Sequence, residues 1–232
     1  MADILIVPDA EGTRVHLRRS ARARRLSLRV GRADGRVTLT LPPRVPMSEA
    51  RAFVMAQREW IARHVAAVPT PRHVGVGGTV PLEGRDVPVV AGHGRSACYE
   101  DGVVAVPDDA RAAPRIRALL RTLAHARLRE AVDRHAETLG RRPIGLKLRD
   151  PRSRWGSCSS RGELMFSWRL VMAPEPVLDY VAAHEVAHLA HMDHSKRFWA
   201  QVAALLPDYA PRRAWLREHG AALHAVDFGT TA

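Results

Sequence analysis

The chain of 232 residues is poor in cysteine, lysine and long apolar segments. Its two cysteines, Cys98 and Cys158, are too few for a disulfide framework and are typical of a reducing compartment. No apolar run is long enough to cross a bilayer, and an acidic residue, Asp3, lies where a secretory signal needs basic ones. We therefore expect a cytoplasmic protein that makes no use of a membrane.

Lysine occurs only at Lys147 and Lys196 among 36 basic residues, so arginine supplies the net charge of +12. Abundant alanine and proline indicate that GC-rich coding contributes to this bias. From Arg14 to Arg36, however, nine arginines accompany one acid, Asp34. A strand that presents these arginines on one face would attract polyanions, which makes nucleic acid a candidate partner. Because no base-stacking aromatic residue interleaves with them, a solvated basic sheet face stays the alternative.

Residues 1–110 are expected to form a β-rich amino-terminal region with one helix. Alternating apolar residues over 25–30 and 36–41 predict two strands, joined by a turn at Asp34-Gly35. The helix is expected over residues 48–67, with Ser48 as its cap. A loop rich in proline and glycine and several short valine-rich strands follow.

Residues 111–232 are expected to be mostly helical, so the whole chain is predicted to be an α+β protein. Pro114 suits the first turn of a long helix, and Gly140 suits the position just after its end. Alternation over residues 144–149 and 163–168 predicts two strands with a loop over 152–161 between them.

The most informative segment is His184-Glu185-Val186-Ala187-His188. Residues four apart on a helix lie on one face, so both histidines can share a metal ion. Glu185 can take a proton from a water molecule at that metal, which is the general-base role in metalloproteases. The preceding apolar residues continue the same inward stripe at spacings of three and four: Val177, Tyr180 and Val181. Because unpaired buried imidazoles are costly, a metal is the expected partner.

A catalytic zinc site needs a third protein ligand, and His191, Asp193 and His194 are the candidates. His191 continues the helical face but lies about 10 Å of rise beyond His184, which is too far to share one ion. His194 is better placed if the helix ends near Met192, so we favour His194. The spacing from His184 to His194 equals that of the metzincin proteases, but their glycine is replaced by His191 and no methionine follows Met192. Membership of the metzincins is therefore not expected.

An ordered set of residues around the motif is more specific than the motif alone. It comprises Arg154-Trp155-Gly156-Ser157-Cys158-Ser159, Trp168-Arg169-Leu170, Tyr180-Val181, His184-Glu185 with His188, His194-Ser195 and Phe198-Trp199. The set resembles the YgjP-like metallopeptidase family of bacterial, predicted metal-dependent hydrolases, which are related to the SprT-like and other minimal zincins. The strong part of the resemblance covers about residues 150–220, and segments 20–28 and 60–61 extend it to almost the full length.

The resemblance implies that His184, His188 and His194 bind zinc and that Glu185 is the catalytic base, but it does not settle the substrate. We expect a peptide or protein substrate. The resemblance also implies a zincin-like metallopeptidase domain over residues 111–232, with a long backing helix, a small sheet and the helix that carries the motif. In minimal zincins the edge strand of this sheet can hold an extended peptide. The edge is expected at Met165, Phe166 and Ser167.

Several other residues are candidates for a role in the site. Negative charge on the former carbonyl oxygen needs a donor, and Tyr180, Tyr209 and Arg154 are preferred to Arg152 and His219. Core packing is an equal alternative for both tyrosines. Three more side chains have structural interpretations: Cys158 as a small packing residue rather than a nucleophile or spare ligand, and His125 and His135 without metal-like spacing. Trp155 is expected either to stack on substrate or to anchor its loop.

A zinc metallopeptidase is the leading hypothesis, and two alternatives stay open. The arginine excess would also suit a metal-dependent nucleotide pyrophosphatase, although no phosphate-binding loop of the Walker type is present. The third hypothesis is a basic nucleic-acid-associated module in which zinc is structural. Structural zinc usually has four protein ligands, so the number of ligands distinguishes this hypothesis from an enzyme.

Overall fold

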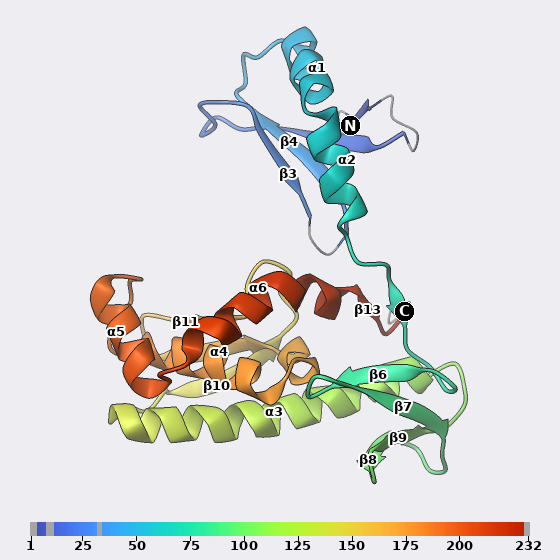
Figure 1. Cartoon of the computed structure of the whole chain (residues 1–232), viewed down its shortest axis with the longest axis vertical. Coiled ribbons are helices and arrows are strands. Elements are labelled where there is room, and N and C mark those ends of the chain that lie inside the picture. Colours follow the sequence, from blue (N-terminus) through green and yellow to red (C-terminus); the bar gives the residue numbers. More distant parts are fainter. Residues whose placement is uncertain (1–3, 8–11, 32–33, 230–232) are drawn as a thin grey trace. The chain divides into compact units, whose positions relative to one another are not determined.

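The structure is a computed structural model that describes residues 4–7, 12–31 and 34–229 (Figure 1). The chain divides into two compact units, Met1–Thr70 and Pro71–Ala232. This division differs from the expected boundary at residue 110. The reason is that valines between the two positions, including Val80 and Val104, share one buried core with Ile116 of the long helix.

The first unit contains a four-stranded sheet in the order β1-β2-β4-β3. Its strands are β1 (Ile4–Ile6), β2 (Arg14–Arg19), β3 (Ser27–Val30) and β4 (Val37–Leu41). The strands β2 and β4 are parallel, and the other neighbours are antiparallel. Gly35, with a φ of 64°, lies in the turn between β3 and β4, in agreement with the predicted hairpin. Two helices cover one face of the sheet and bury Leu39, Val54 and Ile61.

The prediction of a single helix over residues 48–67 is wrong, because the structure has two helices there. They are α1 (Met47–Ala56) and α2 (Arg58–Ala66), and Gln57 between them has φ and ψ of −101° and 10°. Pro46 is the N-cap of α1, so Ser48 falls inside the first turn and forms no cap hydrogen bond. Neither proline nor glycine marks the break at Gln57, which explains why the sequence pattern did not predict it.

The second unit begins with β5 (Arg72–His73), which pairs with the short strand β13 (Val226–Asp227) near the end of the chain. A four-stranded sheet follows, in the order β6-β7-β9-β8. Its strands are β6 (Thr79–Leu82), β7 (Arg85–Ala91), β8 (Cys98–Glu100) and β9 (Val103–Val106). The long helix α3 (Ala112–Leu139) packs against this region and ends at Gly140, whose φ of 70° is the left-handed conformation predicted for it.

A three-stranded sheet in the order β10-β12-β11 lies closest to the motif helix. Its strands are β10 (Gly145–Arg149), β11 (Gly156–Cys158) and β12 (Glu163–Ser167). The prediction that Met165, Phe166 and Ser167 form an edge strand is wrong. These residues belong to β12, the central strand, which pairs with β10 on one side and β11 on the other. The edge strands are instead β10 and β11, and β11, which contacts α4, lies inside the predicted loop. Its three residues, Gly-Ser-Cys, show no apolar alternation that could have indicated a strand.

The remaining helices of the second unit include the one that carries the His184–His188 motif. They are a 3₁₀ helix η1 (Trp168–Met172), α4 (Glu175–Ala187), α5 (Lys196–Leu205) and α6 (Tyr209–Ala225). Helix α4 contacts α3, α5, α6, η1 and β11, and most of its residues are buried. An apolar helix buried on all sides is a rigid support for the polar residues that it carries. Within the described residues, no helix combines the length and the hydropathy that crossing a bilayer requires.

An ion-pair network holds α4 to its neighbours through Asp179. Its Oδ1 lies 2.8 Å from Nε2 of His135 and 2.9 Å from Nη2 of Arg134, both on α3. Its Oδ2 lies 3.6 Å from Nη1 of Arg212 on α6. Burial alone would raise the pKa of Asp179, but the hydrogen bond from His135 and the charge of Arg134 outweigh it and lower the pKa below 3.8. His135 is therefore structural in this arrangement.

Asp179→Asn is expected to lower the free energy of unfolding by about 2 kcal/mol at pH 7, because the buried His135 and the two arginines lose their charged acceptor. A lowered folded-state pKa stabilises the protein above the unfolded-state pKa, and this contribution decreases below about pH 4 and is lost as the pH falls through the folded-state pKa. Urea unfolding of both proteins at pH 7 and at pH 3 measures the difference. Asp86→Asn, which removes an exposed partner of Arg72, is the control and should cost under about 0.5 kcal/mol. A loss at Asp179 that is as large at pH 3 as at pH 7 would contradict this account.

Candidate metal centre and active site

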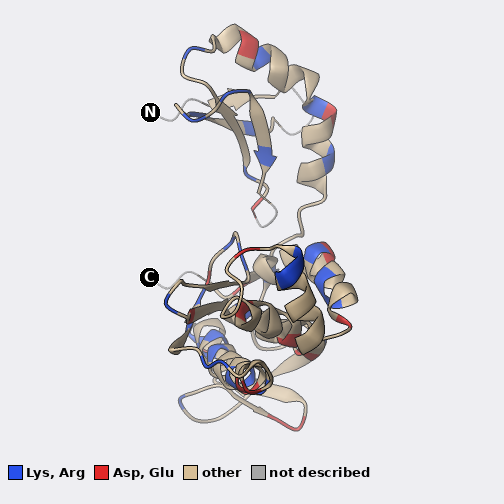
Figure 2. Cartoon of the chain, turned by 90° about the vertical axis from the view of Figure 1, so that its left-hand side faces the viewer, with Lys and Arg blue, Asp and Glu red and all other residues tan. Residues whose placement is uncertain are grey.

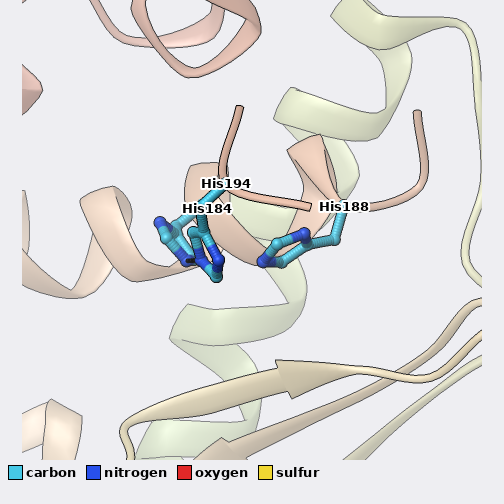
Figure 3. Close-up of side chains that lie close together, drawn as sticks. All are labelled: His184, His188 and His194. Carbon is cyan, nitrogen blue, oxygen red and sulfur yellow. Dashed lines mark hydrogen bonds between the residues drawn. The ribbon is translucent and has the colours of Figure 1, made fainter. Parts of the chain in front are cut away.

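Three histidines converge in the second unit (Figure 3). Helix α4 presents His184 and, at its C-cap, His188, and the chain then returns to bring in His194. The ligand nitrogens of the three side chains all lie within 4.8 Å of one another. Nε2 of His184 and Nε2 of His194 are 3.2 Å apart. Within the described ranges, this is the group of histidine, cysteine and carboxylate side chains that could hold a metal ion.

The geometry and the protonation states both suit a metal. Nitrogens bound about 2.0–2.1 Å from one tetrahedral ion are about 3.3 Å apart, close to the separation of the two Nε2 atoms. Burial lowers the pKa of His184 to about 3, with further lowering by His188 and His194. Burial also lowers the pKa of His188. Neutral imidazoles offer the lone pairs that metal binding requires, so these three residues fit a bound cation.

Residues between the ligands orient them. Nδ1 of His188 lies 2.9 Å from the carbonyl oxygen of His191, and a carbonyl can only accept, so Nδ1 donates and Nε2 keeps its lone pair. A carboxylate oxygen of Asp193 accepts from the backbone N–H of Ser195 at 3.2 Å, at the start of α5. His191 and Asp193, the two alternative third ligands, thus lie outside the group of three and shape the turn that delivers His194. Helix α4 also ends one turn before the expected position near Met192.

Glu185 lies beside the histidines and is 4% exposed. Its Oε2 is buried without a hydrogen-bond partner in the described protein. Burial raises the pKa of Glu185 to about 8, and the charge of Arg154 opposes the rise. A cation held by the histidines would act in the same direction as Arg154. It would lower the pKa of Glu185 and so favour the charged carboxylate that a general base requires. An unpaired buried carboxylate is expensive, so the site is built to receive a polar group at this oxygen.

The edge strand β11 packs directly on this carboxylate through Gly156. A Cβ atom at Gly156 would lie 2.5 Å from Oε1 and 2.6 Å from Cγ of Glu185. The sequence contained Gly156 only as part of the resembling segment, and nothing in its local pattern indicated contact with Glu185. A glycine is therefore required for β11 to approach the motif helix this closely.

A cleft of about 520 Å³ opens over the motif. Its walls come from α4 and from β11 with the loop before it, and Met192 and Leu216 add apolar surface. Arg154 is the basic residue of the lining and Glu185 is the acidic one. Strand β11 pairs with β12 along one of its sides. Its other side has no neighbouring strand in this sheet, and the residues of β11 line the cleft.

The predicted oxyanion donors occupy different places. Tyr180 lines the cleft, and its ring centroid lies 5.9 Å from that of His184. Burial raises the pKa of Tyr180 to about 12, so its hydroxyl stays protonated and able to donate. Tyr209 is outside the cleft lining and stacks between Tyr180 and Trp199, with ring centroids 6.3 and 5.5 Å away. The structure therefore brings Tyr180 and Arg154 to the cleft, whereas Tyr209 packs behind Tyr180.

Other side chains at the histidines and in the cleft lining have packing contacts that hold the site together. Phe198 contacts all three histidine rings, at centroid distances of 4.4 to 4.9 Å. Trp155 stacks on His224 at 4.6 Å, which anchors its loop to α6. Burial, with the charge of Glu185, raises the pKa of Cys158 to about 11, so this thiol is protonated at neutral pH and suited to packing. Sequence reasoning did not identify Phe198 as a support, because its contacts depend on how α5 returns to α4.

Comparison with known proteins agrees with the motif. The YgjP-like, metallopeptidase domain family matches residues 24–219, which include parts of both units. No curated protein matches the chain. Among solved structures, the crystal structure of the metallopeptidase zymogen of Pyrococcus abyssi abylysin is similar, with 20% identity over 40% of this chain and 92% of that chain and a TM-score of 0.36. Because the family matches most of its residues, the chain belongs to the YgjP-like family of metallopeptidase domains.

Proposed function

We propose that the protein is a zinc-dependent peptidase in which His184, His188 and His194 hold the metal and Glu185 is the general base. Family membership supports the coarser class, a metal-dependent hydrolase. One observation carries the finer assignment: three mutually close imidazole nitrogens lie beside a buried carboxylate oxygen that has no partner in the described protein. The residue types and their placement match the needs of metal-assisted hydrolysis.

Zinc bound by the three histidines would polarise the scissile carbonyl and lower the pKa of a water molecule. Glu185 accepts the proton of that water on a carboxylate oxygen and passes it to the leaving amine. Phe198, stacked on His188, and the carbonyl of His191 keep the imidazole in one orientation during these steps. Tyr180, with its protonated hydroxyl at the cleft, donates to the developing oxyanion, and Arg154 is the second candidate for this role.

The open edge of β11 supports a peptide as the substrate. An extended chain can add to a sheet edge through main-chain hydrogen bonds, which would place its carbonyl groups along the cleft. The nucleotide alternative has less support, since Arg154 is the single arginine among the described residues that line the cleft, and triphosphates need several cationic contacts. The structural-zinc alternative also has less support, because the group contains three residues rather than four.

His194→Ala is expected to reduce bound zinc, measured by atomic emission after dialysis, from one per chain to well below one. Loss of the third ligand leaves two histidines of α4, which bind zinc too weakly to retain it. His191→Ala is the matched control, because its backbone carbonyl still accepts from His188. Zinc retained in His194→Ala but lost in His191→Ala would reassign the third ligand.

The substrate class is tested by incubating zinc-loaded protein with a peptide library and, separately, with a nucleotide pool, followed by mass spectrometry. Chelator-treated protein and Glu185→Gln serve as controls. We expect peptide cleavage by the zinc-loaded wild-type protein alone. Nucleotide products with the same dependence would replace the peptidase assignment, and the absence of zinc-dependent products from both pools would overturn the proposed function.

A further inference from the structure

The first unit has a sheet face that its own helices do not cover. Helices α1 and α2 pack on the side of the sheet that carries Leu39 and Leu41 (Figure 1). Since side chains alternate along a strand, the residues between these buried positions point to the opposite side. The outward residues on β2 are Arg14, His16 and Arg18, on β3 Ser27 and Arg29, and on β4 Thr38 and Thr40.

The strand register groups these residues into rows across the sheet. His16 pairs with Thr38, and Thr38 pairs in turn with Arg29. Arg18 pairs with Thr40 in the next row. Arg36, one residue before β4, places Nη2 3.3 Å from Nδ1 of His16. We call Arg14, Arg18, Arg29 and Arg36, with the hydroxyls of Thr38 and Thr40 between them, the arginine face.

The four strands of this sheet contain no acidic residue, and the acid next to the arginine face is Asp34, whose Oδ1 accepts from the backbone N–H of Arg36 at 3.2 Å. Figure 2 shows the acidic positions among the described residues of this unit on the two helices and at the hairpin tip, and basic positions on both the strands and the helices. These acids are Glu49 on α1, Glu59 on α2 and Asp34 in the hairpin. Arg14, Arg18 and Arg29 are exposed. Exposed cations with no carboxylate partner within the described sheet raise the local positive potential.

Charge is concentrated in this unit as a whole. Residues 1–70 hold 13 arginines, no lysine and six acidic residues, so they carry +7 of the net +12 in under a third of the chain. The exposed turn between β2 and β3 adds three more arginines next to the arginine face: Arg22, Arg24 and Arg25. The partner that this distribution complements is a polyanion.

We propose that the arginine face binds the phosphate backbone of double-stranded nucleic acid without reading its sequence. Guanidinium groups form paired hydrogen bonds with phosphate oxygens, and threonine hydroxyls add single ones. The arginine face carries no phenylalanine, tyrosine or tryptophan, so it lacks the stacking platform that single strands require. An anionic membrane is a poorer match, because the apolar side chains beside the arginine face are limited to Ile4 and Ile6 on the edge strand β1.

The test measures binding of the full-length protein to a fluorescent 20-base-pair DNA duplex by anisotropy over a series of salt concentrations. The variant Arg14→Ser/Arg18→Ser/Arg29→Ser removes three charges from the arginine face. The control Arg51→Ser/Arg58→Ser/Arg63→Ser removes three exposed charges from the helices of the same unit. Circular dichroism checks that both variants keep their fold.

We expect the first variant to bind about 30-fold more weakly at 0.1 M salt and its log–log salt slope to fall by about 2 to 3. The control should bind within about threefold of the wild-type protein. Equal weakening in both variants would overturn the proposal, since it would show attraction to net charge rather than to this face. Absence of duplex binding would also overturn it, as would tighter binding to vesicles of anionic lipid than to the duplex.

Discussion

Replacing Glu185 with glutamine is expected to lower kcat for peptide hydrolysis by about 10³-fold, within the range that general-base catalysis contributes. Glutamine keeps the size and shape of the side chain but cannot accept the proton of the attacking water. The metal ligands are unchanged, so zinc content should stay at one per chain. Steady-state kinetics on a cleaved library peptide, together with atomic emission, measure the two quantities on the same sample.

Glu163→Gln is the matched control for this experiment. Glu163 lies on β12 of the neighbouring sheet, and its exposed carboxylate pairs with Lys147 at 2.6 Å. Its replacement should leave kcat within about twofold of the wild-type value. Full activity of Glu185→Gln would show that Glu185 is not the general base. Loss of zinc from this variant would show that the substitution lowers kcat by disturbing the metal site instead.

Gly156→Ala is expected to lower kcat by about 10²-fold while zinc is retained, because a small misplacement of a catalytic group has an effect of this size. The added Cβ would lie 2.5 Å from Oε1 of Glu185, a separation that real Cβ atoms do not show. Either the carboxylate rotates away or β11 moves outward, and both displace the base from its working position. Gly156 is thus a positioning residue, and the loss should be seen in kcat more than in KM.

Gly145→Ala provides the control in the same sheet. Gly145 begins β10, and a Cβ atom there would meet no atom within 4 Å. This variant should therefore keep its kcat within about twofold. If Gly156→Ala is as active as Gly145→Ala, the close packing of β11 on Glu185 does not position the base.

Long regular elements could be predicted from the sequence because their signals are local. The helix beginning near Pro114 and ending at Gly140 has a proline and a glycine at its two ends, and α3 follows that prediction within two residues. The hairpin at Asp34-Gly35 was predicted for the same reason. In the site, spacing alone placed His184 and His188 on one helical face, and the structure has them there.

Other features could not be predicted, since their cause lies in distant parts of the chain. Strand β11 exists because β12 offers it a pairing edge, and its own residues carry no strand signal. Helix α4 ends early, at Ala187, and the turn that follows is held by the hydrogen bond between Nδ1 of His188 and the carbonyl oxygen of His191. The residues between Thr70 and position 110 join the second unit because their valines fill the core beside α3.

The sequence by itself determined that His184 and His188 lie on one helical face with Glu185 next to them in the chain, because helical periodicity places residues four apart on one side without any help from the rest of the fold. Only the tertiary structure decided which groups surround this segment. It brings Nε2 of His194 to within 3.2 Å of Nε2 of His184, packs Gly156 against the carboxylate of Glu185 and buries Glu185, which raises the pKa of that carboxylate. These three features depend on contacts between segments far apart in the chain. Such contacts follow from the packing of whole elements, which no local pattern of residues encodes.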